Sequence, residues 1–276
     1  MATGIRSRPF RRAVEFDGPD TAVSIGVVVP FDFSLDWEYW SYLPAGVSLH
    51  FTRTPHRAGE VGAALARSES RPSTVAKATR SLSSVSPAAV LYACSSGSFI
   101  GGVEGEAAIR QALLDAGPPA AVTTAGATVD ALRLTGMRRV SVATPYSARL
   151  TAKFADFMED SGFEVTSAHH LGVTRNISRI SQATIKDLVR EADAVEADAV
   201  MVSCTALRTW GIVNQLEGEL GRPVFTSNQV SLWAVLRAAG VLGDVIARRD
   251  GWTMGGSDPA RSTRMLAKVD AAAGAA

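Results

Sequence analysis

The sequence has few cysteines, few histidines and almost no net charge, and each of these shortages excludes a class of function. Its 28 basic and 27 acidic residues leave a formal charge of +1, so no overall field favours nucleic acid or an anionic membrane as a partner. None of the four histidines is spaced as HxxxH or HExxH, and no CxxC is present. Metal ligands commonly adopt these spacings, so we expect no bound metal.

The two cysteines, Cys94 and Cys204, are far apart in the chain. The basic N-terminus is followed by no apolar segment of the kind found in signal peptides or membrane-spanning helices. Together these features predict free thiols in a reducing, cytoplasmic setting rather than a disulfide framework. We expect residues 1–20 to form a flexible basic arm, with a targeting role as the alternative, and residues 246–276 to form a loosely ordered tail.

What the chain does have is a series of short apolar runs separated by helix-compatible segments. Hydrophobic residues make up 46% of the sequence and the mean hydropathy is +0.11, which suits an ordinary buried core. Apolar runs that alternate with helical segments are typical of parallel sheets covered on both faces. The expected strands lie at residues 24–29, 47–52, 89–93, 120–124, 139–144, 164–171, 199–203 and 222–228.

This pattern occurs twice along the chain. Each half has a strand ended by proline and an aromatic residue (Pro30, Pro145), then a second strand, a strand ended by cysteine, and a strand introduced by proline. A repeated order of this kind indicates a duplicated unit. We predict an α/β fold of two pseudosymmetric Rossmann-like lobes, each with a four-stranded parallel sheet flanked by helices. The first lobe comprises residues 21–124 plus 229–245, and the second comprises 125–228.

Both cysteines directly follow a buried type of strand and precede a hydroxyl residue, Ser95 or Thr205. Ligands of parallel sheets bind beyond the carboxyl ends of the strands, so a pseudo-twofold would bring the two thiols face to face across a cleft between the lobes. Hydroxyl groups and backbone N–H groups after each strand could hold a carboxylate. The alternative is that both cysteines are small buried side chains without chemistry.

Three further residues have more than one interpretation. Asp32, after the first strand, could bind a substrate ammonium group, orient a thiol or cap the next helix. Tyr146 could donate to an oxyanion or only pack in the core. Asn176 could face the cleft or cap a helix that begins near residue 177.

With these motifs in place, the chain resembles the Asp/Glu/hydantoin racemase superfamily, in its maleate cis-trans isomerase and arylmalonate decarboxylase branch. The likeness covers about residues 22–240, and the segments 30–38 and 49–54 are most similar to the EutA group of ectoine-utilisation proteins. The resemblance implies a cofactor-free site between the lobes and a homodimer or homotetramer. By motif it implies catalytic roles for Cys94 and Cys204, and substrate-binding roles for Ser95, Ser96, Tyr146, Asn176, Thr205 and Ala206. Asp32 has no counterpart in that pattern, and we expect it to bind substrate from its place after the first strand.

Two departures bear on the activity. Maleate isomerases have an asparagine where this chain has Phe33, and the neighbouring Asp32 would repel a dicarboxylate. The decarboxylases keep only the second cysteine, whereas this chain has both. We therefore expect a cofactor-independent isomerase or racemase acting on a small carboxylate, with helix N-termini lowering the thiol pKa values. An arylmalonate-type decarboxylase and a non-catalytic carboxylate-binding protein are the alternatives.

Overall fold

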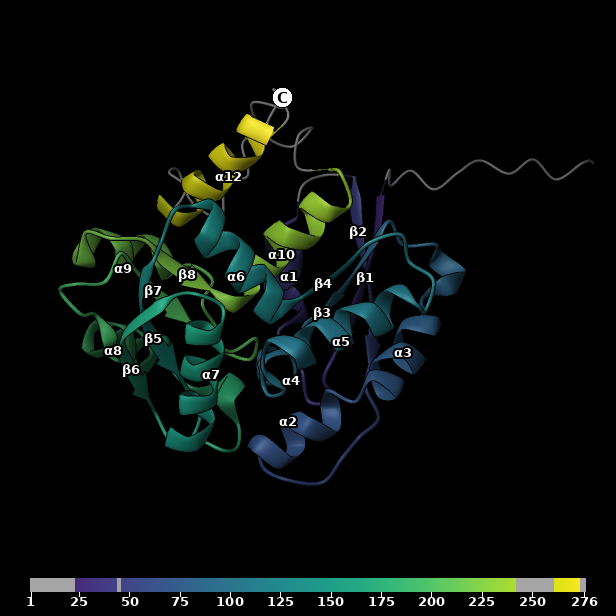
Figure 1. The fold of residues 1–276 in the computed structure, drawn as a ribbon, viewed down its shortest axis with the longest axis horizontal. Coiled ribbons are helices and arrows are strands. Elements are labelled where there is room, and N and C mark those ends of the chain that lie inside the picture. Colours follow the sequence, from purple (N-terminus) through teal and green to yellow (C-terminus); the bar gives the residue numbers. More distant parts are fainter. Residues whose placement is uncertain (1–22, 44–45, 242–260, 274–276) are drawn as a thin grey trace, which may run out of the picture.

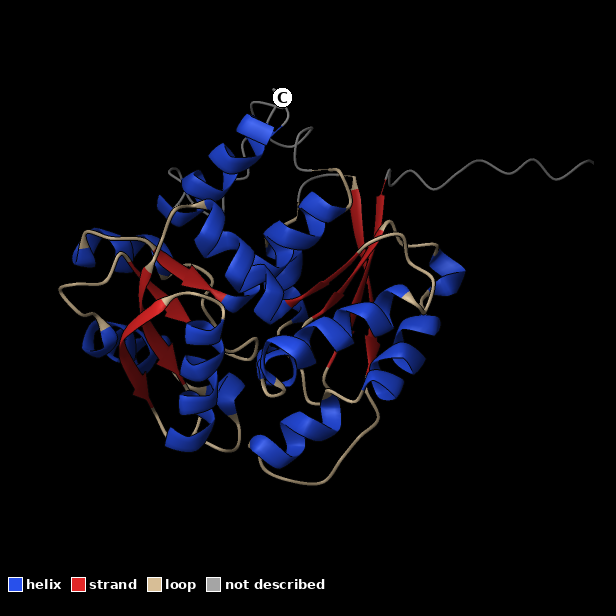
Figure 2. Ribbon diagram, in the orientation of Figure 1, coloured by secondary structure: helices blue, strands red, loops and turns tan. Residues whose placement is uncertain are grey.

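The computed structural model describes residues 23–43, 46–241 and 261–273. It contains two four-stranded sheets in which every strand pairing is parallel. The strand order is β2-β1-β3-β4 in the first sheet and β6-β5-β7-β8 in the second. The predicted fold of two four-stranded parallel sheets flanked by helices is thus confirmed, and Figure 2 shows the strands in two separate groups.

The strands follow the apolar runs of the sequence. In the first sheet they are β1 (Val23–Val29), β2 (Val47–Arg53), β3 (Ala89–Tyr92) and β4 (Ala121–Thr123). In the second they are β5 (Arg139–Thr144), β6 (Glu164–His170), β7 (Ala199–Val202) and β8 (Val224–Thr226). The central strands β3 and β7 are buried along their whole length, as expected for strands covered on both faces.

Helices cover the faces of both sheets. Around the first sheet are α1 (Asp36–Ser41), α2 (Ala63–Glu69), α3 (Pro72–Arg80), α4 (Ser95–Phe99) and α5 (Gly102–Leu114), with the 3-10 turn η1 (Ser83–Val85). Around the second are α7 (Ala148–Asp160), α8 (Gln182–Ala192) and α9 (Val213–Leu220), with η2 (Ile177–Arg179). Helices α6 (Thr124–Leu134) and α10 (Ser227–Ala238) lie between the two sheets in Figure 1.

Helix α10 connects the two sheets. It continues directly from β8 of the second sheet, and it packs against β3 and β4 of the first. Its start is fixed by a capping box, in which the Thr226 side chain accepts from the Gln229 backbone and the Gln229 side chain accepts from the Thr226 backbone. Because residues 227–236 are all buried, this helix forms part of the core rather than a surface layer.

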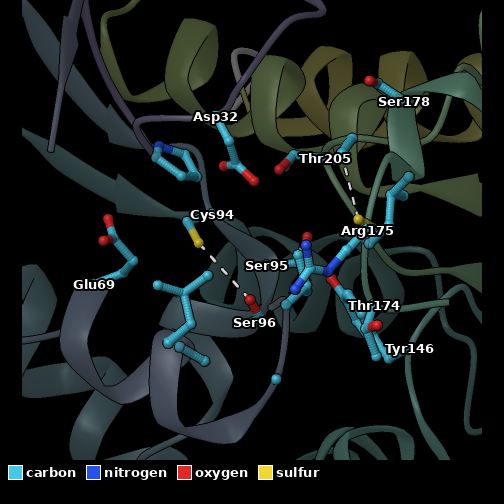
Figure 3. Close-up of a pocket in the computed structure, with 18 of the residues that line it drawn as sticks. Asp32, Glu69, Cys94, Ser95, Ser96, Tyr146, Thr174, Arg175, Ser178 and Thr205 are labelled. Atoms are coloured by element: carbon cyan, nitrogen blue, oxygen red, sulfur yellow. Dashed lines mark hydrogen bonds between the residues drawn. The ribbon is translucent and has the colours of Figure 1, made fainter. Parts of the chain in front are cut away.

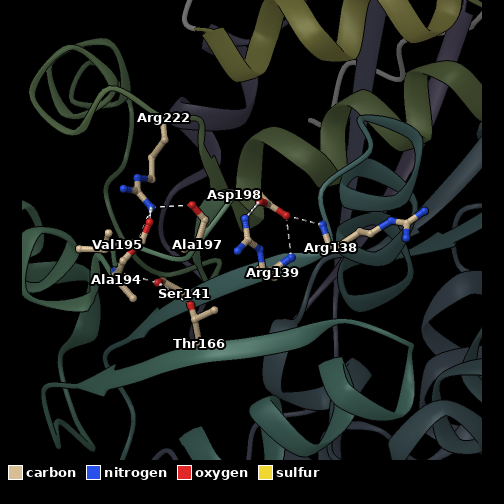
Figure 4. A network of polar contacts seen from close by, with 9 residues as sticks. All are labelled: Arg138, Arg139, Ser141, Thr166, Ala194, Val195, Ala197, Asp198 and Arg222. Atoms are coloured by element: carbon tan, nitrogen blue, oxygen red, sulfur yellow. Dashed lines mark hydrogen bonds and ion pairs between the residues drawn. The ribbon is translucent and has the colours of Figure 1, made fainter.

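A polar network holds the amino ends of the second sheet's strands (Figure 4). Asp198 accepts hydrogen bonds from the backbone N–H groups of Arg138 and Arg139, at 3.0 and 2.9 Å, and from the Arg139 side chain at 2.8 Å. Arg222 donates to the carbonyls of Ala194 and Ala197. These contacts fix β5, β7 and β8 at the end opposite to the one that carries Cys204.

The C-terminal part of the chain differs from the prediction. Residues 261–273 form helix α12 (Arg261–Ala273), in which Leu266 is fully buried. Ser262 and Thr263 accept hydrogen bonds from Gln229 of α10. The prediction of a loose tail is therefore wrong for this part, because polar and apolar contacts dock it on the core. The predicted basic arm at 1–20 and the other residues of the predicted tail lie outside the described residues.

Candidate active site

One cavity of about 410 Å³ lies at the carboxyl ends of both sheets (Figure 3). It is lined by segments that follow β1, β3, β5, β6 and β7, together with the helix α2. All nine site residues selected from the sequence line it: Asp32, Cys94, Ser95, Ser96, Tyr146, Asn176, Cys204, Thr205 and Ala206. The structure thus brings the two cysteine motifs to a single cavity.

Cys94 is the N-cap residue of α4 and is only 5% exposed. Its sulfur accepts a hydrogen bond from the Gly97 backbone N–H at 3.3 Å and lies 3.9 Å from the Ser96 hydroxyl. Tyr92, below it in the strand, donates its hydroxyl proton to the Glu69 carbonyl at 3.0 Å. The thiol therefore sits on a short, tightly packed turn rather than in open solvent.

Gly97 is required for this packing. A Cβ at this position would lie 2.3 Å from the Tyr92 hydroxyl and 2.9 Å from the Cys94 sulfur. Contacts this short do not occur, so a side chain at position 97 would displace the thiol, the tyrosine or both. The glycine that follows the Cys-Ser-Ser motif thus allows the backbone to approach the sulfur.

Cys204 follows β7 and is 7% exposed. Its sulfur accepts from the Ala206 N–H at 3.4 Å, and its own N–H donates to Ser227 at 3.1 Å. The helix N-terminus expected after each cysteine is absent here, because residues 205–212 form turns and α9 begins only at Val213. The turns are held by Glu38, to which the Thr209 N–H and hydroxyl donate.

The predicted low thiol pKa values are wrong, because burial raises the pKa of both cysteines. Burial raises the pKa of Cys94 to about 12, against the opposing effect of the Gly97 N–H. Burial likewise raises the pKa of Cys204 to about 11, although the Tyr146 hydroxyl and the Ala206 N–H favour its thiolate. A few N–H donors from short turns do not offset the loss of water around a buried sulfur.

Hydroxyl groups connect the two cysteine turns across the lobes. Ser95 donates to the Ser227 hydroxyl at 3.0 Å, and Ser227 in turn accepts from the Cys204 backbone. Thr205 donates to the Ala93 carbonyl at 3.4 Å. Since Ser95 and Ala93 flank Cys94 while Thr205 flanks Cys204, these contacts fix the position of one thiol relative to the other.

Tyr146 and Asn176 also face the cavity. Tyr146 is fully buried at 2% exposure, and the nearby Cys204 and Cys94 sulfurs add to the burial that raises its pKa. Asn176 adopts a left-handed backbone conformation (φ 53°) before η2, and its side chain makes no capping hydrogen bond. Asn176 is thus the N-cap residue of η2 by position, as the alternative expected, but its side chain does not cap the turn.

Asp32 is not a helix cap. Helix α1 begins at Asp36, its N-cap residue is Leu35, and no side chain caps it. Asp32 instead points into the cavity in Figure 3. Its surroundings raise the pKa of its carboxyl, with desolvation as the main cause and Arg53 opposing it.

Two charged residues of the cavity, Glu69 and Arg175, are not among those predicted from the sequence. Glu69 ends α2 and is 2% exposed, and Arg175 lies in the loop before η2 and pairs with Glu60 at 3.0 Å. Nothing in the motif pattern marks either residue. Helix α2, which carries Glu69, and the loop that carries Arg175 come close to the cysteines only when the chain is folded. Among the residues that the structure describes, no cluster of His, Cys, Asp and Glu could hold a metal ion.

Comparisons with known proteins agree with this geometry. The family model described as arylmalonate decarboxylase matches residues 67–250. Among curated relatives, the arylmalonate decarboxylase of Bordetella bronchiseptica is 32% identical over 52% of this chain and 61% of its own length. The maleate isomerase of Nocardia farcinica is 29% identical over 57% of this chain and 66% of its own. The matched part of the chain thus spans somewhat less than two thirds of the length of each of these two relatives.

Solved structures extend the similarity over most of the fold. Nocardia farcinica maleate cis-trans isomerase bound to TRIS superposes with a TM-score of 0.73 at 25% identity, over 90% of this chain and 99% of that one. A cysteine-to-serine mutant of the same isomerase, with a TM-score of 0.71 at 24% identity over 89% and 98% of the two chains, has a covalently bound succinylcysteine intermediate. Within the described residues, no helix has the length and apolar composition needed to span a bilayer.

Proposed function

The chain belongs to the arylmalonate decarboxylase family, and we propose that it is a cofactor-independent isomerase or racemase that uses Cys94 and Cys204 on a small carboxylate. The observation that carries this proposal is the lining of one cavity by both thiols, each from the carboxyl end of a central strand of its own sheet. A single reactive thiol would serve decarboxylation, whereas two thiols from two lobes suit chemistry on both faces of a substrate.

For a tetrahedral carbon the proposed reaction is racemisation. One cysteine, as thiolate, removes the proton from the carbon next to the carboxylate, and the electron pair left behind is delocalised into that carboxylate. The other thiol then gives its proton to the opposite face. One proton is taken up and one is released in each turnover, so no oxidant, reductant or further co-reactant is needed.

For an activated alkene the same two groups would support cis-trans isomerisation. The thiolate adds to one alkene carbon, and the electrons of the double bond move to the carbon beside the carboxylate. Rotation about the resulting single bond and elimination of the thiolate restore the double bond. The succinylcysteine intermediate of the Nocardia farcinica isomerase supports a covalent step of this kind in the family.

The high thiol pKa values place a condition on either reaction. With pKa values of about 11 and 12, only a very small fraction of either thiol is ionised near neutral pH. We propose that the thiolate forms as substrate binds, when a proton can pass to a neighbouring group. Cys204 is the better placed for this, because the Tyr146 hydroxyl and the Ala206 and Leu207 N–H groups all favour its thiolate.

Arylmalonate-type decarboxylation is the second candidate, favoured by the 32% identity to the Bordetella bronchiseptica enzyme. In that reaction a carboxylate leaves as CO2, its bonding electron pair stays on carbon, and one thiol supplies the proton. Cys204 corresponds to the cysteine expected in this role. Decarboxylation needs one thiol, so it predicts that activity survives the loss of Cys94.

The test is incubation of wild type, Cys94→Ala and Cys204→Ala with a panel of chiral and unsaturated carboxylates in deuterated water. The proposal predicts deuterium exchange, loss of optical activity or alkene isomerisation in wild type, and none of these in either variant. CO2 release that depends on Cys204 alone would establish the decarboxylase instead. Binding of carboxylates without any exchange or turnover would indicate a non-catalytic binding protein.

Substrate identity and assembly are further parts of the proposal. Similarity to the EutA group favours a substrate from ectoine utilisation, and the maleate isomerase relatives favour a dicarboxylate. We propose a cytoplasmic homodimer or homotetramer. The two half-exposed indole rings of Trp37 and Trp40 on α1 support a subunit contact there, which light scattering of wild type and of Trp37→Ser would test.

A further inference from the structure

The cavity has two carboxyl groups on one wall. Asp32 follows β1 and Glu69 ends α2, and both line the cavity with the two thiols. Each lies close enough to a thiol to affect its ionisation, Asp32 for Cys204 and Glu69 for Cys94. In Figure 3 the Asp32 carboxyl points toward the middle of the cavity, and Cys94 lies between Glu69 and Ser96. We call Asp32 and Glu69 the acidic wall.

No cation fully neutralises the acidic wall. Arg53, whose charge favours the ionised form of Asp32, donates to the Phe33 carbonyl at 2.6 Å and lies 3.5 Å from Asp36. In the described part of the chain, Asp32 itself forms no ion pair. Its carboxyl is thus left facing the cavity.

Glu69 is paired only weakly. One of its oxygens accepts from the Thr54 hydroxyl, but the other, Oε1, lies 3.9 Å from Arg57 Nε, which is too long for a hydrogen bond. Both of these facing atoms are buried without a hydrogen-bond partner. Among the described residues that line the cavity, Arg175 is the one arginine or lysine, and Glu60 already binds it.

The wall therefore distinguishes ligands by charge. Burial raises the pKa of Glu69, and the nearby carboxyl of Asp32 adds to that rise, because two neighbouring carboxylates disfavour each other's ionised form. A second carboxylate placed beside them would add a third negative charge in a partly desolvated site, whereas a cation would relieve the existing repulsion. A substrate with a positive group has an energetic advantage here that a dicarboxylate lacks.

We propose that the substrate carries an ammonium or other cationic nitrogen in addition to its carboxylate, and that Asp32 binds this nitrogen while Glu69 strengthens the attraction. This proposal rests on the proposed function for the carboxylate end and the thiol chemistry. It makes the substrate an amino acid or an amine-bearing acid, rather than the dicarboxylate of a maleate isomerase.

The test compares the affinities of matched ligands by calorimetry at low ionic strength. A series of ω-amino acids with two to six carbons is paired with the dicarboxylates that have a carboxylate in place of the ammonium group. We expect at least one amino acid to bind wild type about tenfold more tightly than its dicarboxylate partner. The preference should shrink as salt is added, because salt screens the charges.

Substitutions test which residue causes the preference for an ammonium group over a second carboxylate. Asp32→Asn should reduce the affinity ratio to near one, and Glu69→Gln, which keeps an oxygen for Thr54, should reduce it less. Asp36→Asn is the control, because Asp36 carries a carboxyl close by but does not line the cavity, and it should leave the ratio unchanged. The proposal is overturned if no pair favours the ammonium compound, or if Asp32→Asn preserves the wild-type ratio.

These results are separable from those that test the proposed function. Thiol-dependent deuterium exchange without any charge preference would leave the isomerase or racemase in place and remove the amine-bearing substrate. The opposite result is a charge preference that Asp32→Asn abolishes, in a protein whose deuterium exchange depends on neither cysteine. It would support the amine-bearing substrate and remove the two-thiol isomerase or racemase.

Discussion

Glu38 and Thr209, 171 positions apart in the chain, are joined by three hydrogen bonds. The Thr209 N–H donates to both Glu38 oxygens, at 3.3 and 3.2 Å, and the Thr209 hydroxyl donates to Oε1 at 2.8 Å. Asn228 of α10 adds a fourth hydrogen bond at 3.0 Å. A fully buried carboxyl from the first lobe thereby fixes the turns that follow Cys204 in the second.

Replacing Glu38 with glutamine should loosen these turns. The amide nitrogen cannot accept a hydrogen bond, so either the Thr209 N–H loses one of its two acceptors, or the Thr209 hydroxyl and the Asn228 amide lose theirs. An unsatisfied buried group of this kind costs about 1–3 kcal/mol, which urea unfolding would measure. We also expect lower kcat/KM, because Cys204 and Thr205 lie on the released segment. Glu191→Gln, at an exposed position of α8, is the control, and equal stability of the two variants would show that the contact is dispensable.

Alanine in place of either cysteine should leave the fold intact and remove turnover. Both thiols are small side chains at strand ends, and the sulfur hydrogen bonds at 3.3 and 3.4 Å are weak. We expect unfolding midpoints close to that of wild type, with turnover falling at least about a hundredfold if both thiols take part in proton transfer.

Ser98→Ala serves as the comparison for these variants. The hydroxyl of Ser98 is fully buried, donates to the Cys94 carbonyl at 2.8 Å and accepts from the Ala125 N–H, but Ser98 does not line the cavity. The Ser98→Ala variant should therefore have a lower free energy of unfolding while it keeps a functional pair of thiols. Turnover above a tenth of the wild-type value in Cys94→Ala would exclude a mechanism that needs two thiols.

The buried thiols should make the protein less stable at alkaline pH. In the unfolded chain a cysteine ionises near its ordinary pKa of about 8.5, whereas the folded protein holds the two protons up to pKa values of about 11 and 12. Between these values the unfolded chain binds fewer protons, so the folded state loses up to about 1.4 kcal/mol per pH unit for each thiol.

Urea unfolding of wild type and of the double variant Cys94→Ala, Cys204→Ala between pH 7.5 and 10.5 would measure this effect. The difference cancels the titration of lysines and tyrosines, and we expect the double variant to gain relative stability as the pH rises. A difference that does not change with pH would mean that the folded thiols ionise as they do in the unfolded chain.

The sequence predicted the position of the site better than its electrostatics. Apolar runs such as 89–93 and 199–203 mark strands buried on both faces, and parallel strands carry whatever follows them to the same edge of the sheet. The pattern of strands alone therefore places Cys94 and Cys204 together. The burial of each sulfur depends on which side chains close over it, and the sequence pattern contains no such information.

Glu69 and Thr209 illustrate the same limit. Glu69 is one carboxylate in an otherwise ordinary helical segment, and only the packing of α2 near Cys94 brings it to the cavity. Residues 205–212 read as helix-compatible, but the hydrogen bonds from Thr209 to Glu38 hold them as turns. Such contacts between distant segments override local propensity.

Gly97 should tolerate no side chain, in contrast to Gly105 a short distance along the chain. A Cβ at position 97 would be 2.3 Å from the Tyr92 hydroxyl and 2.9 Å from the Cys94 sulfur, whereas one at position 105 meets nothing within 4 Å. Tyr92 is fully buried and hydrogen-bonded to Glu69, so it cannot move aside without losing that contact. We expect Gly97→Ala to cost about 1–3 kcal/mol through overpacking and to reduce turnover strongly.

Gly105→Ala, inside helix α5, should instead be neutral or stabilising by about 0.5–1 kcal/mol, because alanine is the better helix former. Three measurements on both variants distinguish a general loss of stability from a displaced sulfur. They are thermal unfolding, turnover and the rate of iodoacetamide labelling of Cys94. If Gly97→Ala is merely unstable, Cys94 in its folded fraction keeps the wild-type labelling rate. If the methyl group displaces the sulfur, that rate changes even at temperatures where the variant is fully folded. Wild-type stability, turnover and labelling in Gly97→Ala would show that the close approach of backbone and thiol is not needed at this site.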